Sequence, residues 1–431
     1  MSEDKGLTTR IDRKLSGLSN SFSKQRIFRV DHKLRSQNEV AYEPQMFSIG
    51  PYHHGKENLV KAQTYKLWYL KELLLRRGES STERYINALK DIEDEARSWY
   101  AEEDMIGLGS DEFVEMMLLD GFFIIEFLRK YAGWCLYKEY PLNYGPKQSD
   151  PIFLNRRKMG CLFRDILLFE NQLPFFILVR LFEMTKSPGG DEEENLVDLA
   201  IFPDSPLHLF FPGEKPVSLP NPTTNIAGNV GDNGDSQDNC STSGEVNEHI
   251  KCASELRQAG IKFETANKSV SWLDIAFEKG VMKIPTLDVH DVTECVFRNL
   301  IGFELYMING LYDRRYIIDY VTFMDSLIAS SRDVEKLRRQ KIITKWLGDD
   351  EAISSVFNGL VKEVETYTGN DVFCYSRVFK QVNEYSSRRW NIWRAHVMRN
   401  YIENHWSIMS IVLLSLTFVQ TIFSILQFEN E

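Results

Sequence analysis

The chain has 431 residues, of which 43% are hydrophobic and 12% are aromatic. That apolar content is enough to form a buried core, so a mostly disordered protein is excluded. The formal net charge is −11, which opposes a general nucleic-acid binder because such proteins present a basic surface, and we expect no nucleic-acid partner.

The N-terminal half of the chain is predicted to be helical after a flexible N-terminus at residues 1–25. That N-terminus contains no apolar stretch of the kind found in a secretory signal peptide. Apolar residues recur at helical spacing over 59–76 and, more weakly, over 83–101. Ser110 is a good N-cap for a helix through residue 130, whose second half is apolar nearly all round. We therefore expect this helix to be buried on several sides.

Residues 160–185 form a further apolar run, which Pro174 is expected to kink or divide. The run also contains Arg and Glu, so we interpret it as part of the core rather than as a membrane span. One stretch of it, CLFRDILLFE at 161–170, shares five identical residues with CVFRNLIGFE at 295–304. The similarity indicates either two equivalent core helices or a chance likeness between apolar helices.

The composition changes at residues 213–248, which are rich in Pro, Gly, Asn, Asp and Ser and are interpreted as a disordered insert. Residues 261–289 are rich in β-formers and predict a small antiparallel sheet, with Glu278-Lys279-Gly280 as a hairpin turn. Further helices are predicted at 293–309, 313–329, 332–346, 350–366 and 371–403. The fold class is therefore mainly α with a small antiparallel β-sheet (α+β), and residues 26–403 are expected to form one cytosolic helical domain.

A single transmembrane helix is predicted at residues 404–428, followed by a short tail at 429–431. The span contains no Asp, Glu, Lys or Arg, and Ile, Leu, Val and Phe fill 12 of the 20 positions from 407 to 426. Residues 406–428 would extend about 34 Å as a helix, against a hydrocarbon core of about 30 Å. The alternative is a buried core helix.

The orientation of this span is predicted from the charges that flank it. Basic residues precede it, whereas acidic residues and Asn430 follow it; the basic set that we single out comprises Arg388, Arg389, Arg394 and Arg399. The positive-inside rule then places the N-terminal body in the cytosol, as in a tail-anchored protein with the lipid bilayer as partner. The basic segment is interpreted either as a surface against anionic headgroups or as an ordinary solvated helix. The length of the span favours the plasma membrane over the endoplasmic reticulum, although length sorts only weakly.

One face of the predicted span carries small hydroxyl side chains at heptad spacing. The residues of this face are Ser407, Ser410, Thr417, Thr421 and Ser424. Small residues let transmembrane helices approach closely, so this face predicts a homo-oligomer formed through the helix. The alternative is that the hydroxyls bond to the backbone of their own helix.

Several polar residues could carry chemistry, and each has a structural alternative. Glu170-Asn171-Gln172 could provide a general acid, or could bond exposed backbone groups at a helix break. Asp120 and Glu126 lie in the apolar helix and invite the same hypothesis, although a buried carboxylate is more often paired with an arginine. His53 and His54 could hold a metal only together with residues distant in sequence.

Residues 50–56 match the first seven positions of a phosphate-binding loop, but Glu57 stands where Ser or Thr should hold magnesium. Pro51 also removes one backbone N–H from the cradle, so we interpret the segment as a rigid turn. No signature of a hydrolase, kinase, dinucleotide-binding enzyme or zinc protease is present. We therefore assign no catalytic, cofactor-binding or metal-binding residues, and we expect no cofactor.

The chain resembles a plant family, domain of unknown function 247, also called uncharacterised protein family 0481. The resemblance covers residues 26–428. Its blocks include FRVDHKLRSQNEVAYEPQMFSIGPYHHG at 28–55, SDEFVEMMLLDGFFIIEFL at 110–128 and FRDILLFENQLPFFIL at 163–178. It implies a plant membrane protein without an established enzymatic activity, and some grass members of the family are implicated in self-incompatibility. The insert at 213–248 and His405, where the family tends to have Pro, are departures from the pattern.

The leading functional hypothesis is a membrane-tethered, non-enzymatic interaction or recognition protein with an unidentified protein partner. An enzyme with an unrecognised site around Glu170, Asp120 or the histidines is one alternative. A structural membrane scaffold is the other. A deep pocket with converging polar groups would favour the enzyme, because such pockets are the usual setting of catalysis.

Overall fold

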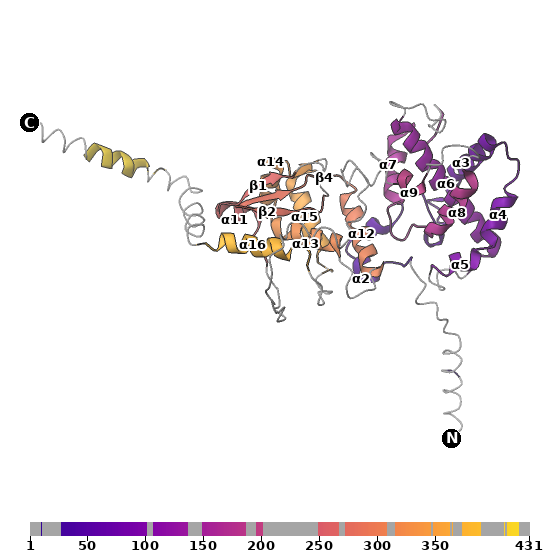
Figure 1. The fold of residues 1–431 in the computed structure, drawn as a ribbon, viewed down its shortest axis with the longest axis horizontal. Helices are drawn as coiled ribbons and strands as arrows, with labels where there is room; N and C mark the ends of the chain where they lie inside the picture. Colours follow the sequence, from indigo (N-terminus) through magenta and orange to yellow (C-terminus); the bar gives the residue numbers. More distant parts are fainter. Residues whose placement is uncertain are drawn as a thin grey trace, which may run out of the picture. The chain divides into compact units, whose positions relative to one another are not determined.

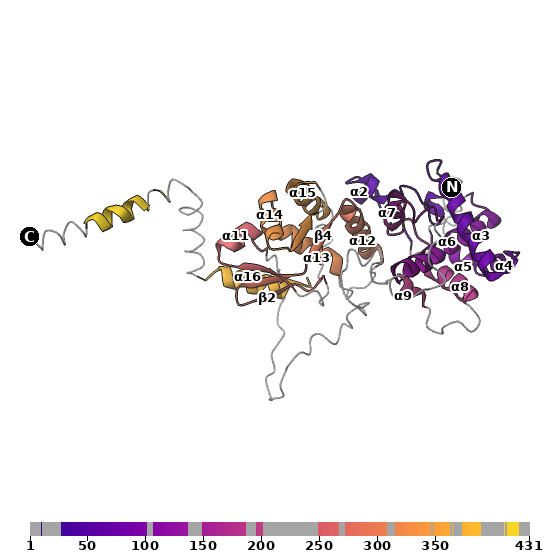
Figure 2. The same ribbon diagram turned by 90° about the horizontal axis from the view of Figure 1, so that it is seen from above.

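The computed structural model describes residues 10, 27–100, 107–136, 149–186, 195–200, 249–266, 272–307, 315–345, 348–362, 364, 373–388, 409 and 412–421. The chain forms two compact units (Figures 1 and 2). Unit 1 comprises Met1–Leu209 and Val292–Gly310, and unit 2 comprises Phe210–Asp291 and Leu311–Glu431. We expected residues 26–403 to form one domain, whereas each unit takes two separate stretches of this range.

Unit 1 is helical in its described residues, and its elements come from both stretches of chain. They are α2 (His32–Arg35), η2 (Glu39–Tyr42), η3 (Pro51–His53), η4 (Val60–Ala62), α3 (Gln63–Arg77), α4 (Glu83–Lys90), α5 (Glu93–Arg97), α6 (Ser110–Leu136), α7 (Arg156–Asp165), α8 (Phe175–Thr185), α9 (Leu196–Ala200) and α12 (Thr293–Met307). Helix α6 packs against α3, α4, α8 and α9, so it forms the centre of the unit (Figures 1 and 2).

The central position of α6 follows from its sequence. Residues 116–133 are all buried except Ile124, which is half-buried. Phe122 and Phe123 have no exposed surface, and each buried phenylalanine contributes about 1.5–3 kcal/mol relative to an exposed one. The prediction that this helix is buried on several sides is confirmed.

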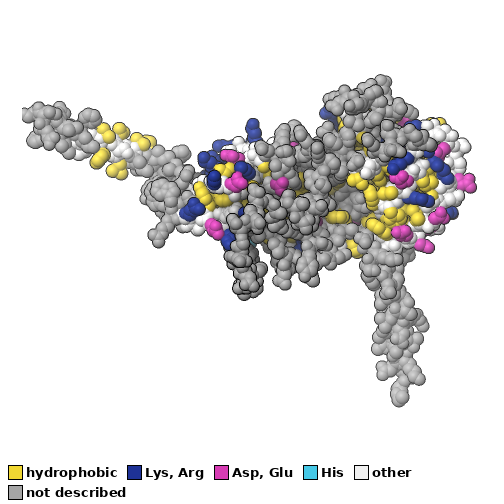
Figure 3. All heavy atoms as spheres, in the orientation of Figure 1, with side chains coloured by type: hydrophobic (Ala, Val, Ile, Leu, Met, Phe, Trp, Pro, Cys, Tyr) yellow, Lys and Arg dark blue, Asp and Glu magenta, His cyan; other side chains and the backbone are white. Residues whose placement is uncertain are grey.

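The other helices of unit 1 follow the predicted pattern with shorter elements. The run at 59–76 forms η4 and α3, and the run at 83–101 forms α4 and α5. The run at 160–185 is divided as predicted, because Pro174 occupies the N-cap of α8 and has no N–H for a preceding turn. On the face of this unit shown in Figure 3, hydrophobic side chains gather with charged side chains of both signs around them.

Unit 2 combines short strands with helices. Its elements are α11 (Ala253–Gln258), β1 (Lys262–Thr265), β2 (Ala276–Glu278), β3 (Val281–Ile284), β4 (Leu287–Val289), α13 (Tyr316–Leu327), α14 (Ser331–Arg339), β5 (Ile343–Lys345), α15 (Asp350–Leu360) and α16 (Ser376–Ser386). One sheet has the order β1-β3-β2, with β2 antiparallel and β1 parallel to β3, and a second pairs β4 with β5 in parallel. The α+β class is confirmed, but the sheet is mixed rather than antiparallel, and β5 lies in the stretch 332–346 that we predicted to be helical.

The β2–β3 hairpin turns at the residues that the sequence indicated. Lys279 and Gly280 both have positive φ angles, of 50° and 84°, as a two-residue hairpin loop of type I′ requires. A Cβ atom at Gly280 would lie 2.5 Å from the Tyr385 hydroxyl. The glycine therefore permits both the turn and the close packing of α16 on the hairpin.

The prediction of a membrane-spanning helix at 404–428 needs correction. Among the residues that the structure describes, no helix is long and apolar enough to cross a membrane. Within the predicted span the described residues are Met409 and 412–421, all of them helical. The expected insert at 213–248, the tail at 429–431 and, apart from Arg10, the N-terminus at 1–25 lie outside the described residues.

Candidate functional site

The segment of residues 43–56 crosses the middle of unit 1 and is held there by buried polar side chains. Asp165, at the end of α7, accepts hydrogen bonds from three successive backbone N–H groups, those of Gln45, Met46 and Phe47, at 2.8–2.9 Å. Burial raises the pKa of Asp165, while these N–H donors act in the opposite direction. This carboxylate thus replaces the hydrogen bonds that the segment would make in a sheet or a helix.

The polar cluster Glu170-Asn171-Gln172 has the same supporting role. The Asn171 amide accepts from Ile49 N at 2.7 Å and donates to Phe47 O at 2.9 Å. Gln172 donates to two carbonyl groups, at positions 166 and 168, between α7 and α8. The alternative interpretation, in which this cluster bonds exposed backbone at a helix break, is therefore confirmed for Asn171 and Gln172.

Glu170 is buried among cationic and imidazole groups. It accepts from Val30 N at 2.7 Å and from the Arg35 guanidinium at 2.5 Å. His53 Nε2 lies 3.7 Å from Glu170, and His53 Nδ1 lies 3.5 Å from Glu43. Burial, followed by the positive charge of Lys56, lowers the pKa of His53 to about 4.

The two buried carboxylates of α6 are both paired. Asp120 contacts Lys66 Nζ at 2.5 Å and accepts from Gly50 N at 2.9 Å, while Lys66 donates to Ser48 O at 2.6 Å. Glu126 binds both terminal nitrogens of Arg76, at 2.6 and 2.7 Å. The expectation of an arginine partner holds for Glu126, whereas Asp120 is paired with a lysine.

The turn at residues 50–56 does not form a phosphate cradle. The N–H group of Gly50 already donates to Asp120, and residues 51–53 form the 3-10 helix η3. Gly50 has a φ of 70°, and a side chain there would collide with the carbonyl oxygen of Gln172. The segment is a rigid turn packed into the core, as we interpreted it.

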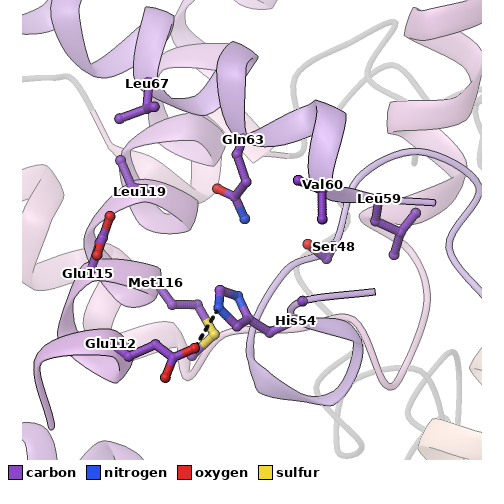
Figure 4. Close-up of a pocket in the computed structure, with 11 residues that line it drawn as sticks. Ser48, His54, Leu59, Val60, Gln63, Leu67, Glu112, Glu115, Met116 and Leu119 are labelled. Carbon is purple, nitrogen blue, oxygen red and sulfur yellow. Dashed lines mark ion pairs between the residues drawn. The ribbon is translucent and has the colours of Figure 1, made fainter. Parts of the chain in front are cut away.

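A cavity of about 320 Å³ opens above this buried layer, between α3, α6 and the segment 48–60 (Figure 4). Its floor consists of buried side chains, namely Ser48, Leu59, Met116 and Leu119. Val60 and Leu67 stand at its edge, and each is 53% exposed. The cavity is therefore largely apolar at its base and is open to solvent.

Polar groups converge on this cavity from both helices and from the turn. His54 Nε2 lies beside Glu112 Oε1 at 3.5 Å, and Glu115 and Gln63 also line the cavity (Figure 4). His54 Nδ1 and Gln63 Oε1 are buried and have no hydrogen-bond partner among the residues that the structure describes. Buried polar atoms are rarely left unpaired in proteins, so these two atoms mark the cavity as a place where a ligand can bind.

The cavity also contains the three residue types of a hydrolase triad. Ser48, His54 and Glu112 line it together, but the Ser48 hydroxyl contacts Lys66 Nζ at 3.5 Å, and His54 Nδ1 has no partner. Lys66 Nζ also contacts Asp120 at 2.5 Å and donates to Ser48 O at 2.6 Å. The nucleophile–base hydrogen bond that activates a serine is absent from this described site.

Of the remaining predicted residues, those that the structure describes do not line this cavity. Arg388 lies with its guanidinium 5.4 Å from the ring centre of Tyr385. Thr417 and Thr421 donate to carbonyl groups of their own helix, at 2.7 Å from the Leu413 and Thr417 oxygens. The residues outside the described part of the chain are Arg389, Arg394, Arg399, Ser407, Ser410 and Ser424. Nothing in these contacts tests the predicted self-association.

Sequence reasoning found His54 but missed the other residues of the cavity. Glu112, Glu115, Met116 and Leu119 have the spacing i, i+3, i+4, i+7 and so share one face of α6. Acidic residues in the first turns of a helix are usually explained by the helix dipole. Glu112 and Glu115 therefore gave no separate indication of a binding site. Across the described residues, no group of three His, Cys, Asp or Glu side chains could hold a metal ion.

Comparisons with known proteins place most of this chain within one plant family. A family described as "plant protein of unknown function", domain of unknown function 247, matches residues 27–419. The UPF0481 protein At3g47200 of Arabidopsis thaliana is 28% identical, over 94% of this chain and 87% of its own length. The putative UPF0481 protein At3g02645 of the same plant is 22% identical, over 92% and 90%. No solved structure matches the chain significantly. The chain therefore belongs to the plant family of domain of unknown function 247.

Proposed function

We propose that this chain is a non-enzymatic recognition protein, and that a partner polypeptide binds in the cavity between α3 and α6. The observation that carries the proposal is the combination of a buried apolar floor with two buried polar atoms, His54 Nδ1 and Gln63 Oε1, that have no hydrogen-bond partner in the described part of the chain. Binding pockets combine an apolar lining with a few polar groups that fix orientation. Interface hot spots are likewise centred in well-packed pockets.

The size of the cavity supports a side chain rather than a cofactor as its occupant. Its volume of about 320 Å³ lies at the lower end of the range of roughly 300–1,000 Å³ for ligand pockets. The charged groups beneath it, Lys66 and Asp120, already hold the backbone of Ser48 and Gly50. They supply a rigid base for the cavity and are not available for chemistry.

A photo-crosslinking experiment tests the proposal. A photoreactive residue at Leu67, at the edge of the cavity, should capture a defined protein from plant tissue. Leu75 serves as the matched control, because it lies on the same helix and is 68% exposed but does not line the cavity. Equal capture at both positions, or capture at neither, would overturn the proposal.

A hydrolase is the second candidate, and the convergence of Ser48, His54 and Glu112 on one cavity favours it. A fluorophosphonate probe distinguishes the two, because it labels only a serine activated by a base. We expect no labelling at Ser48, with Ser48→Ala as the reference. Labelling of the wild type that is lost in this variant would replace recognition with catalysis.

A further inference from the structure

We propose that the group bound in the cavity between α3 and α6 is a guanidinium, supplied by an arginine side chain of the partner polypeptide. This inference rests on the proposed function and names the chemistry by which the partner is recognised. It follows from three features of the cavity, which are its charge, its hydrogen-bond acceptors and its apolar edge.

The charge of the cavity is negative. Glu112 and Glu115 line it, and none of the described residues that line it is a lysine or an arginine. Lys66, which donates to the carbonyl oxygen of the lining residue Ser48, is paired with Asp120 at 2.5 Å. Glu112 is 55% exposed at its side chain, so it remains accessible to an incoming group. A cationic group is therefore attracted to the cavity, whereas a carboxylate or a phosphate is repelled.

The acceptors of the cavity favour a ligand that donates hydrogen bonds. Gln63 Oε1 is a buried acceptor without a hydrogen-bond partner among the described residues, and the carboxyl groups of Glu112 and Glu115 are acceptors as well. A guanidinium offers five N–H donors in a rigid planar fork and has no acceptor, so it can reach several acceptors at once. An ammonium group concentrates its charge and its donors at one atom, so it can reach fewer of these separate acceptors.

The apolar edge fits the rest of an arginine side chain. Val60 and Leu67 are exposed at the mouth, and Met116 forms part of the floor. The methylene stem of arginine packs along apolar surface while its charged end makes polar contacts. The cavity thus places apolar surface beside acceptors and carboxyl groups, as the stem and the charged end of an arginine side chain require.

Methyl NMR of the full chain with isotope-labelled methionine tests this inference. Met116 lines the cavity, and its methyl signal is identified by its loss in Met116→Leu. The probes are N-acetyl-arginine methylamide and its neutral counterpart N-acetyl-citrulline methylamide, which has nearly the same shape. We expect the arginine probe to shift the Met116 signal saturably. The citrulline probe should bind with an affinity at least about fivefold lower, because it lacks the charge that contacts the partly exposed carboxyl groups.

A double variant defines the role of the carboxylates. Glu112→Gln with Glu115→Gln should weaken the arginine probe about fivefold and leave the citrulline probe unchanged. Glu83→Gln with Glu95→Gln is the matched control, because both residues are exposed and neither lines the cavity. Equal binding of both probes, no shift with either probe, or equal effects of the two double variants would overturn the inference.

The crosslinking readout separates this inference from the proposed function. If Leu67 still captures its partner in the Glu112→Gln/Glu115→Gln variant with undiminished yield, the partner binds without the carboxylates, and only the inference fails. If the arginine probe binds as expected but Leu67 captures no protein, the cavity binds cations but no partner polypeptide, and the proposed function fails.

Discussion

Breaking the ion pair between Lys66 and Asp120 should strongly lower the free energy of unfolding of unit 1. Both side chains are essentially buried, and Asp120 also accepts from Gly50 N. Replacing Asp120 by alanine leaves a buried ammonium without its partner, which costs about 3–5 kcal/mol. It also orphans the Gly50 N–H, at a further cost of about 1–3 kcal/mol. Since whole domains are stable by only about 5–15 kcal/mol, the variant should be severely destabilised.

Removing both charges together should be less damaging than the single changes suggest. Lys66→Met alone leaves Asp120 buried and unpaired, at a cost of about 3–5 kcal/mol. In Lys66→Met/Asp120→Ala neither charge remains, and the cost falls to that of two unpaired backbone groups, at Ser48 and Gly50, or about 2–6 kcal/mol. The double variant should therefore be more stable than the sum of the singles by about 3 kcal/mol or more.

Hydrogen exchange of the full chain measures these effects where they arise. Peptides that cover residues 45–54 and α6 report the free energy of opening of this part of unit 1. A conservative variant, Asp120→Asn, keeps an acceptor for Gly50 and should fall between the wild type and Asp120→Ala. Single variants that each cost less than about 1 kcal/mol, or a double variant equal to their sum, would show that this ion pair does not hold the segment in place.

Three further changes test other contacts. With the pKa of His53 lowered from 6.5 to about 4, the unfolded chain binds a proton between these pH values and the folded chain does not. Stability present above pH 6.5 should thus fall by about 3 kcal/mol towards pH 4, and His53→Gln should flatten this loss in urea titrations at each pH. Gly280→Ala should destabilise unit 2 by more than Gly78→Ala destabilises α3, because both have positive φ but only Gly280 is crowded, by Tyr385; local hydrogen exchange compares them, and equal effects would refute the crowding. Asp165→Asn should cost about 1–3 kcal/mol and lower the protection of the amides of residues 45–47, whereas unchanged protection would contradict the role of this carboxylate.

Local signals in the sequence were sufficient for those parts of the fold that depend on neighbours in the chain. The break at Pro174 and the hairpin at Lys279–Gly280 are properties of single residues with restricted or permissive backbones. The burial of α6 follows from apolar residues on most of its faces. Each of these could be predicted because the physical cause lies within one turn or one helix.

Pairings between distant residues could not be predicted in this way. Strand β5 lies in a stretch that has a helical pattern, but α14 ends at Arg339, and Lys341 adopts a φ of 59° before the strand. A positive φ at a lysine has no signal in the sequence, and the partner of β5 is β4, 56 residues earlier at the pair Leu287 and Ile343. The cavity was missed for the same reason, because it exists only where α3 and α6 come together.

The likeness between residues 161–170 and 295–304 has a partial structural counterpart. Asp165 and Asn299 occupy equivalent positions in the two stretches, and each binds backbone of the N-terminal segment, Asn299 through Ala41 O at 2.8 Å. The first stretch leaves its helix after Asp165, however, whereas the second remains helical throughout. Equivalent side chains therefore perform a similar task on helices that are not equivalent.

The division of unit 1 into two stretches of chain sets the order in which it can be completed. Helix α12 belongs to this unit, although it follows the first stretch of unit 2. Asn299 accepts from Phe169 N at 2.8 Å, across 130 residues. The ribosome must therefore synthesise the first stretch of unit 2, Phe210–Asp291, before unit 1 can be completed, and non-local contacts of this kind slow folding. A fragment that ends at residue 209 lacks Asn299, so it should leave Phe169 N and Ala41 O without this partner. We expect such an incomplete unit to bind chaperones.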